Sequence, residues 1–251
     1  MSKYRNIIIL AVSSLVLLAA SWGCRGKLPS MSSMAQPIAK VPDYVIDNFE
    51  DGNTIFNTSL RGASAGTWTN YGTSGQSTVN TASYVLINTL ADALNPTGMA
   101  AHVLGSLTDP ANGSYPEVTL QGRFNKAPYY DASSFTGLKY LILIGSTDTA
   151  TKRRFKITIA KTVPISNGGV CETNCWDHFG INMPAAPTGV WVSQAVTFAT
   201  ATREGWGSPI TPATFTGTNL QELIGLDWCE SRNNMLGTSV IDFWVDEVEF
   251  F

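Results

Sequence analysis

A stretch in the second half of the chain brings together thiols, an indole ring, a carboxylate and an imidazole. Residues Gly168–Gly180 read GGVCETNCWDHFG, with Cys171 and Cys175 four positions apart. The segment has the composition of a loop between strands, and an exported protein meets an oxidising compartment in which a disulfide persists. We therefore predict a Cys171–Cys175 disulfide.

Zinc binding is the alternative use of the same thiols. Cys171, Cys175, His178 and Cys229 would supply three sulfurs and one nitrogen, a ligand set that structural zinc sites use. No feature of the sequence brings Cys229 to this loop, so we favour the disulfide. Cys229 is then expected to be buried beside Trp228 as a small apolar residue.

Trp176, Asp177 and His178 in the same loop carry side chains of the kind that contact sugars. A flat aromatic ring covers the apolar face of a sugar, and a carboxylate or an imidazole can hydrogen-bond its hydroxyls. The alternative is structural: Trp176 caps one end of the fold, and His178 pairs with a backbone carbonyl. Further candidates for ligand contact are Trp68, Tyr71, Tyr129, Tyr130 and Trp206.

The sequence offers few groups for catalysis. His102 and His178 are the two histidines, and neither stands in a recognisable nucleophile setting. Carboxylates are numerous, so a glycosidase that uses two of them stays open as an alternative. We expect a protein without catalytic activity.

Composition limits the possible partners. Hydrophobic residues make up 44% of the chain, charged residues 14%, and the formal net charge is −3. This hydrophobic content is ample for a packed core, and the chain is not of the disordered class. Because the chain has no excess of basic residues, nucleic acid is not an expected partner.

Residues 1–23 have the order of an export signal. Lys3 and Arg5 precede the uncharged run Ile7–Ala20, which is short beside the roughly 20 apolar residues of a membrane span. We therefore prefer a cleaved signal peptide to a transmembrane anchor. Cys24 and the residues before it resemble the lipobox of bacterial lipoproteins, in which this cysteine is acylated. The resemblance implies a lipid anchor at the bacterial cell envelope, at the outer membrane, with residues 24–43 as a flexible tether.

Residues 44–251 have the pattern of one β-domain. Short apolar runs are separated by Asn-Pro, Asp-Pro and Asn-Gly turn signals, and no later segment keeps a helical period for three turns. In Glu117–Phe124 the apolar and polar residues alternate, which predicts a sheet with one solvent-exposed face. The pattern predicts an all-β fold, a single β-sandwich or jelly roll of about ten strands.

Individual strands follow from the same pattern. Ser83–Asn88 reads as a strand, Leu138–Gly145 is apolar on both faces and predicts a central strand, and Arg154–Ala160 alternates with its apolar residues facing inward. The basic cluster Lys152–Arg154 is expected to be a solvated hairpin end.

The last twelve residues, Val240–Phe251, predict a bulged strand. Apolar residues alternate up to Val245, and the alternation resumes at Val248 after Asp246-Glu247. The natural partner for this strand is the early segment Tyr44–Gly52.

Four segments resemble, in this order, jelly-roll carbohydrate-binding modules of the family 11 type. They are Tyr130–Tyr140, Gly205–Gly207, Leu223–Trp228 and Ile241–Asp246, and such modules also show an opening like Asn48–Gly52. The resemblance implies a galactose-binding-domain-like sandwich that binds a polysaccharide or another glycan.

The same resemblance implies a structural calcium ion. In such modules, acids near both ends of the domain bind calcium, and carboxylate and carbonyl oxygens suit that ion. Carried over to this chain, the ligands are Glu50 and Asp246, with Asp47 as a further one. The alternative is that these acids are solvated residues of edge strands that oppose aggregation.

These observations predict a non-catalytic, carbohydrate-binding lipoprotein that touches the membrane only through its lipid. The first alternative is a structural or adhesion protein of the envelope, whose aromatic loops contact a protein partner. The second is a glycan-acting enzyme.

Overall fold

The computed structural model describes residues 44–50, 52, 54–56, 66–72, 77–79, 98–108, 116–124, 129–150, 153–231 and 238–251. The expected signal peptide, Cys24, the tether and the expected strand Ser83–Asn88 lie outside the described residues. Within the described ranges, no helix is long and apolar enough to cross a membrane.

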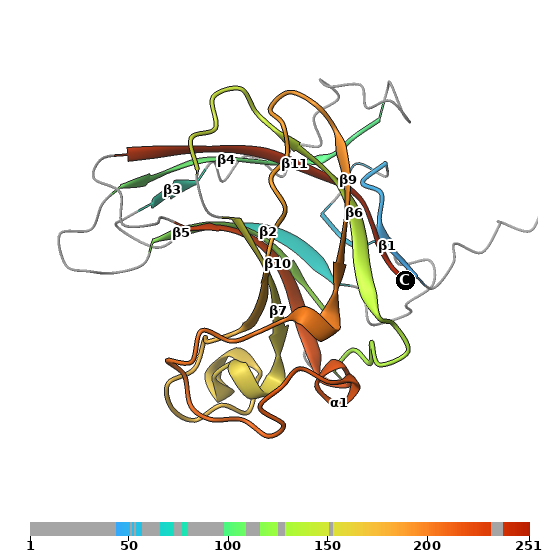
Figure 1. Ribbon diagram of the computed structural model, residues 1–251, viewed down its shortest axis with the longest axis vertical. Coiled ribbons are helices and arrows are strands. Elements are labelled where there is room, and N and C mark those ends of the chain that lie inside the picture. Colours follow the sequence, from blue (N-terminus) through green and yellow to red (C-terminus); the bar gives the residue numbers. More distant parts are fainter. Residues whose placement is uncertain are drawn as a thin grey trace, which may run out of the picture. The chain divides into compact units, whose positions relative to one another are not determined.

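Two antiparallel sheets make up the described domain (Figure 1). The first sheet has the order β3 (Ser77–Val79), β4 (Ala101–Thr108), β11 (Thr238–Phe250), β6 (Gly137–Ile144) and β9 (Val192–Thr197), and β1 (Val45–Asp47) also pairs with β11. The second has the order β2 (Thr67–Gly72), β5 (Glu117–Arg123), β10 (Leu223–Ser231), β7 (Arg153–Ile159) and β8 (Phe179–Asn182). The predicted all-β sandwich is confirmed.

Helical structure in the described residues is limited to single turns. They are the 3₁₀ turns η2 (Ala160–Thr162), η3 (Ile165–Asn167) and η4 (Phe198–Thr200) and the short helix α1 (Gly217–Leu220). The first two lie in the connection from β7 to β8, which contains the two cysteines that are four positions apart.

The core lies between the sheets and is centred on Trp228 of β10. The centroid of its ring system lies 5.1 Å from that of Phe155 in β7. It lies 5.2 Å from the ring centroid of Tyr140 in β6 of the other sheet. Aromatic rings at these separations and angles add to the free energy gained by burying their surface. The alternation predicted from the sequence is therefore confirmed, because the inward side chains of β5, β7 and β11 are buried.

The two ends of the domain pair with each other. Val45 of β1 lies opposite Glu249 of β11, and the register of β11 shifts between Asp246 and Glu249, as the broken alternation predicted. Glu247, inside this bulge, has a φ of 48°. The closing strand thus joins β1, β4 and β6 into one sheet.

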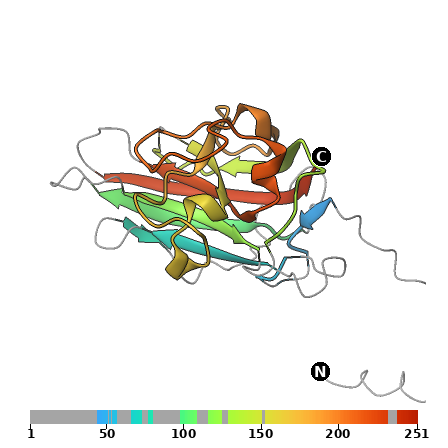
Figure 2. The ribbon, with the colours of Figure 1, turned by 90° about the horizontal axis from the view of Figure 1, so that it is seen from below.

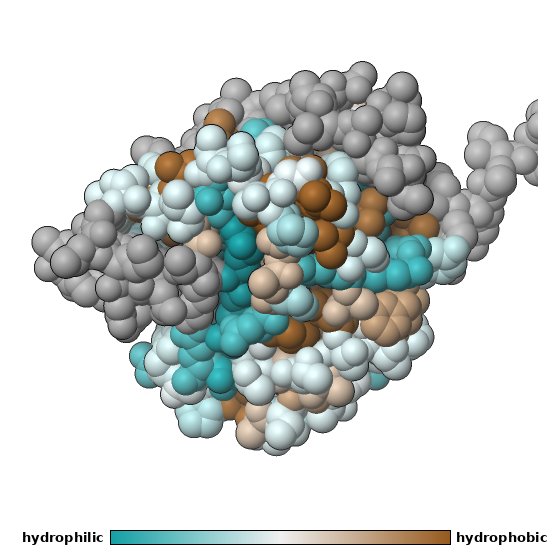
Figure 3. Space-filling model, turned by 45° about the horizontal axis from the view of Figure 1, so that its top comes forward, coloured by the Kyte–Doolittle hydropathy of each residue, from teal (hydrophilic) through white to brown (hydrophobic). Residues whose placement is uncertain are grey.

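Both sheets bend in the same direction (Figure 1), so the backbone of the second sheet is concave on its outer side. The connection from β7 to β8 and the segment after β9 lie against this side, as the view from below shows (Figure 2). Figure 3 looks obliquely from the side of the first sheet and shows a band of hydrophilic residues between apolar patches. Among the described residues on that side, no single apolar patch dominates.

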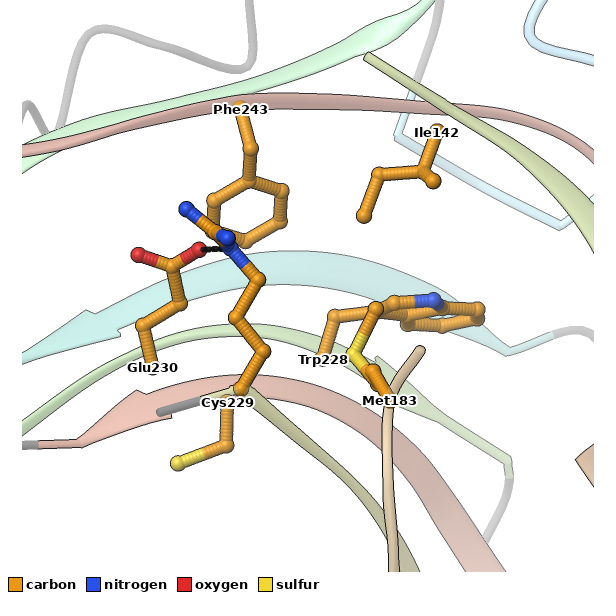
Figure 4. Close-up of a pocket in the computed structure, with 7 residues that line it drawn as sticks. Ile142, Met183, Trp228, Cys229, Glu230 and Phe243 are labelled. Carbon is orange, nitrogen blue, oxygen red and sulfur yellow. Dashed lines mark hydrogen bonds and ion pairs between the residues drawn. The ribbon is translucent and has the colours of Figure 1, made fainter. Parts of the chain in front are cut away.

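The two described residues of the basic cluster, Arg153 and Arg154, do not form a solvated hairpin end, and Lys152 lies outside the described residues. Arg153 points into the sandwich and pairs with Glu230 of β10 and with Asp148, while Arg154 on the other face is 8% exposed. Figure 4 shows Glu230 pointing toward Phe243 of the opposite sheet. Arg154 is buried and Arg153 half-buried because acidic side chains, among them Glu230 and Glu204 from distant segments, accept their hydrogen bonds, which charge patterning alone could not show.

Candidate functional site

The outer, hollow face of the second sheet carries a dense set of polar side chains. Register places directly opposed residues of neighbouring strands on the same face, so Tyr71, Thr119 and Cys229 form one row and Thr69, Gln121 and Asp227 form another. We call this surface the hollow face. Its members are Thr67, Thr69, Tyr71, Glu117, Thr119, Gln121, Arg123, Arg154, Lys156, Thr158, Gly180, Gly225, Asp227 and Cys229.

Arg123 and Asp227 form the first ion pair of the hollow face. The guanidinium of Arg123 donates to both carboxylate oxygens of Asp227, and the Thr158 hydroxyl donates to Oδ2 of the same carboxylate at 3.0 Å. A two-pronged contact of this kind fixes the orientation of both groups. The three side chains therefore present a rigid polar surface across β5, β10 and β7.

Lys156 and Glu117 form the second ion pair. The ammonium of Lys156 contacts Oε2 of Glu117, and the Cys229 thiol donates to the same oxygen at 3.1 Å. Burial raises the pKa of the Cys229 thiol, so this cysteine stays protonated. It was predicted to be buried and is 1% exposed, but it points to the hollow face, away from Trp228 (Figure 4).

Two glycines make room for the arginines of the hollow face. A Cβ at Gly225 would lie 2.2 Å from Nη1 of Arg123, and a Cβ at Gly180 would lie 1.9 Å from Nε of Arg154. The long side chains therefore lie flat over strands that have no side chain beneath them. The Arg154 side chain extends to Glu204, and its Nη1 donates a hydrogen bond to Oε1 of Glu204 at 2.6 Å.

Gln121 lies between these ion pairs with its amide available. Its side chain is half-buried, and no hydrogen bond joins it to another described residue. An amide can both donate to and accept from a hydroxyl. The hollow face thus combines neutralised charges with a free polar group.

Three aromatic rings are exposed on this sheet and on the loops after β7 and η4. Tyr71 on β2 is 45% exposed, Trp176 is 47% exposed and Trp206 is 57% exposed. Trp176 has a φ of 80°, in the left-handed region that ordinary residues avoid at a cost of roughly 1–3 kcal/mol. A large ring held out to solvent on such a backbone is the kind of outlier that marks functional sites.

The sequence predicts Asp177 and His178 as ligand-facing residues, but both side chains are buried in the structure. The Asp177 side chain accepts hydrogen bonds from the backbone N–H groups of Glu204, Gly205 and Gly207, each at 3.0 Å, and is 2% exposed. Both of its oxygens are therefore used within the protein.

His178 is buried in the same region. Thr162 donates to the carbonyl of Ile159, so His178 Nδ1 is the donor in its 2.7 Å contact with Thr162 Oγ1. Burial, and then the positive charges of Lys156 and Arg123, lower the pKa of His178 well below its ordinary value. The imidazole is neutral and structural, with a hydroxyl partner instead of the expected backbone carbonyl.

Trp68 is buried in the core, and Tyr129 is only partly exposed. Trp68 is 3% exposed, packs on Phe49 and Phe56, and donates its indole N–H to Oδ2 of Asp47 at 2.7 Å. Tyr129 is half-buried against Ile224. Trp68 belongs to the core because the alternation of β2 turns it inward, whereas Tyr71 of the same strand faces out.

The predicted Cys171–Cys175 disulfide is confirmed. It excludes the zinc alternative, because it uses two of the four proposed ligands and Cys229 lies on β10 beside Glu117. Among the described residues, no cluster of three or more histidines, cysteines or acids is arranged to hold a metal ion.

The predicted calcium ligands lie near the pairing of β1 with β11 and already have partners. Oδ1 of Asp47 accepts from the backbone N–H of Phe49 at 2.8 Å, and Oε1 of Glu50 accepts from that of Met99 at 2.9 Å. Oδ1 of Asp246 accepts from the N–H of Glu247 at 2.7 Å. Calcium binding by these carboxylates stays a prediction.

The sequence indicated the hollow face only in part. The alternation of Glu117–Phe124 predicts one solvent-exposed face, and Arg123 and Lys156 lie on it, but no sequence motif marks either as a site residue. Their partners come from strands about 40 to 100 residues away, as the separations of 39 between Lys156 and Glu117 and 104 between Arg123 and Asp227 show. The sequence feature that could have identified the hollow face is the polar side of β5 together with Tyr71 on β2.

Comparison with known proteins supports the architecture. No protein-family model matches the chain, and no curated protein matches its sequence. Among solved structures, the family 11 carbohydrate-binding module from Clostridium thermocellum in complex with a β-1,3-1,4-mixed-linked tetrasaccharide is 16% identical; the alignment covers 83% of this chain and 94% of that one, with a TM-score of 0.51. The family 11 module of the cellulosomal cellulase Lic26A-Cel5E of the same organism is 17% identical, with 73% and 86% coverage and a TM-score of 0.46. The alignment with the tetrasaccharide-bound module, together with the two antiparallel sheets, shows that the chain has the β-sandwich fold of family 11 carbohydrate-binding modules.

Proposed function

We propose that this protein binds a polysaccharide on its hollow face. The observation that carries the proposal is the combination of self-neutralised polar groups, Arg123 with Asp227 and Lys156 with Glu117, on a curved sheet face bordered by exposed Tyr71. Hydroxyls of a sugar can exchange hydrogen bonds with such groups, while an aromatic ring covers the apolar side of the sugar ring. The solved structure of the same fold that contains a mixed-linked tetrasaccharide supports this proposal by analogy.

The proposed role is binding without catalysis. Each carboxylate of the hollow face that could act as an acid or a base has a cation or several donors as its partner, as Asp227 has Arg123 and Thr158. Such partners fix the position of a carboxylate, which suits recognition better than proton transfer.

We also propose that the domain is held at the bacterial cell envelope through a lipid on Cys24 and a tether up to residue 43. The support is the order of basic residues, apolar run and cysteine at the start of the chain. A tethered domain would hold a polymer near the cell surface.

Affinity electrophoresis tests the proposal. The protein is run in gels that contain mixed-linkage β-1,3-1,4-glucan, xyloglucan or xylan, beside a gel without glycan. We expect retardation by at least one glycan, and loss of most of that retardation in Tyr71→Ala. Tyr44→Ala is the matched control, because Tyr44 is 43% exposed against 45% for Tyr71 but lies next to β1 of the other sheet.

The outcomes separate the alternatives. Equal mobility in all gels, together with capture of a protein partner through the exposed aromatic residues, would favour the adhesion role. Release of reducing sugar from a retarding glycan would favour an enzyme.

A further inference from the structure

Two exposed tryptophans lie on loops that are bonded to each other. Trp176 follows the disulfide-closed segment after β7, and Trp206 lies in the segment after η4. The hydroxyl of Ser208 donates to the carbonyl of Thr173 at 2.6 Å, and the N–H of Ser208 donates to the carbonyl of Asn174 at 3.1 Å. We call residues 171–177 and 203–208 together the tryptophan rim.

Asp177 is the centre of the tryptophan rim. Its Oδ2 accepts from the N–H groups of both Gly205 and Gly207, the two neighbours of Trp206 in the sequence. Its Oδ1 accepts from the N–H of Glu204, and the Arg203 guanidinium lies 3.2 Å from Oδ2. One carboxylate thus holds the backbone on both sides of Trp206.

The same carboxylate belongs to the residue that follows Trp176. On its other side, Trp176 follows Cys175 of the disulfide, and its own N–H donates to the carbonyl of Thr162 at 2.8 Å. The backbone at Trp176 is therefore fixed from both directions. Asp177 joins this fixed segment to the segment of Trp206.

The local sequence is adapted to this contact. A Cβ at Gly207 would lie 2.5 Å from Cβ of Asp177, and Gly205 has a φ of 91°, which suits glycine. The Gly-Trp-Gly sequence is thus explained by the approach of its backbone to Asp177, and the tryptophan between the glycines is left free of that packing.

We propose that Asp177 is a positioning residue that holds Trp176 and Trp206 as one preorganised aromatic pair for the glycan. This rests on the function proposed above and adds the device that sets the geometry of its aromatic contacts. Rings that are ordered before binding lose less conformational entropy when the ligand arrives, so a preorganised pair binds more tightly than two mobile rings. Asp177 itself does not touch the glycan.

The first test reads the order of the two indoles without any ligand. Heteronuclear NOE values of the tryptophan Nε1–H signals are compared in the wild-type protein, in Asp177→Asn and in Glu249→Gln, a carboxylate-to-amide control on the first sheet. We expect the values of both Trp176 and Trp206 to fall in Asp177→Asn and to stay unchanged in Glu249→Gln. A fall at one tryptophan only, or at neither, overturns the proposal.

A second variant guards against misfolding. Gly207→Ala keeps the carboxylate but forces its Cβ against that of Asp177, so the same joint fall is expected. If Asp177→Asn does not fold, the result with Gly207→Ala decides in the same way.

The second test measures affinity for mixed-linkage β-1,3-1,4-glucan, or for xyloglucan if only that glycan retards the protein. Trp176→Ala and Trp206→Ala should each weaken binding roughly three- to tenfold, as loss of one aromatic contact does. Asp177→Asn should weaken binding to a similar degree, and adding Trp206→Ala to it should have little further effect. A purely structural Asp177 would lower thermal stability and leave affinity unchanged, which contradicts the proposal.

The two proposals fail in different ways. If the wild-type protein binds the glycan and loses it in Tyr71→Ala but not in the rim variants, the hollow face stands and the preorganised pair is overturned. If the wild-type protein binds none of the glycans, the proposed function and the glycan role of the rim are both overturned.

Discussion

Arg123 of β5 lies across Gly225 of β10, with its guanidinium paired to Asp227 two residues further along that strand. The Arg123 side chain can lie in this position because Gly225 has no side chain. Replacing it changes the hollow face without removing a polar group.

Gly225→Ala is expected to displace Arg123 and to weaken glycan binding. The new Cβ would lie 2.2 Å from Nη1 of Arg123 and 2.7 Å from the carbonyl of Gly122, so overpacking should lower the free energy of unfolding by roughly 1–3 kcal/mol. Urea denaturation measures this change. Gly217→Ala is the control, because nothing lies within 4 Å of a Cβ there; an equal loss in both variants would contradict the account.

Stability should depend on pH through Glu230. Burial, and then the nearby Asp148 carboxylate, raises the pKa of Glu230 from an ordinary 4.5 to about 8. As pH rises, Glu230 loses its proton at a lower pH in the unfolded chain than in the folded protein. The free energy of unfolding should therefore fall from about pH 4.5 to about pH 8 and level off above that. The fall has an upper limit of about 5 kcal/mol by the standard conversion.

Glu230→Gln should flatten this dependence, as urea denaturation at about pH 5 and about pH 9 would show. In this variant Arg153 keeps its contact with Asp148, so the ion pair within the sandwich is not lost entirely. Glu249→Gln, in a partly exposed pair with Lys139, should leave the slope almost unchanged. The prediction fails if Glu230→Gln has the slope of the wild-type protein.

The backbone at Trp176 predicts an unusual order of stabilities. Because its φ is 80°, Trp176→Gly should be more stable than Trp176→Ala by about 1 kcal/mol. Trp206 is not among the residues with positive φ, so there the alanine variant should be the more stable one. Thermal melts of the four variants measure both orders, and alanine above glycine at position 176 would contradict the observed backbone.

Calcium binding can be tested on the prediction carried by the resemblance. If Glu50, Asp47 and Asp246 hold calcium, saturating ion at about one hundred times its Kd should stabilise the fold by about 2.7 kcal/mol, which raises Tm by roughly 5 °C. Asp246→Asn should abolish the shift, whereas Asp131→Asn, at an exposed turn, should retain it. Identical melting in calcium and in chelator would rule the ion out as a stabiliser.

The elements that follow a local period were predictable from sequence. The inward set of β11 and its bulge at Asp246 could be found because alternation is written in consecutive residues. The pairing of β1 with β11 also followed, since both segments are apolar and end in acids.

The chemistry of individual side chains was harder to predict, because it depends on contacts between distant segments. The sequence predicts a ligand-facing Asp177, but the backbone N–H groups of Gly205 and Gly207 donate to its carboxylate. The sequence likewise predicts a solvated Arg153, whereas in the structure Arg153 contacts Glu230. In both cases a polar side chain is buried because distant donors or acceptors satisfy it. Exposed Tyr71 and buried Trp68 differ only in which side of β2 they occupy.

The most direct test of the central claim is to map the binding face by NMR. The protein is titrated with a mixed-linkage β-1,3-1,4-gluco-oligosaccharide while backbone and side-chain signals are followed. The account predicts shifts at Tyr71, Gln121 and Lys156 of the hollow face, and none at Leu104 or Lys139 on the outer face of the first sheet. Shifts confined to the first sheet, or no shifts at millimolar oligosaccharide, would contradict it.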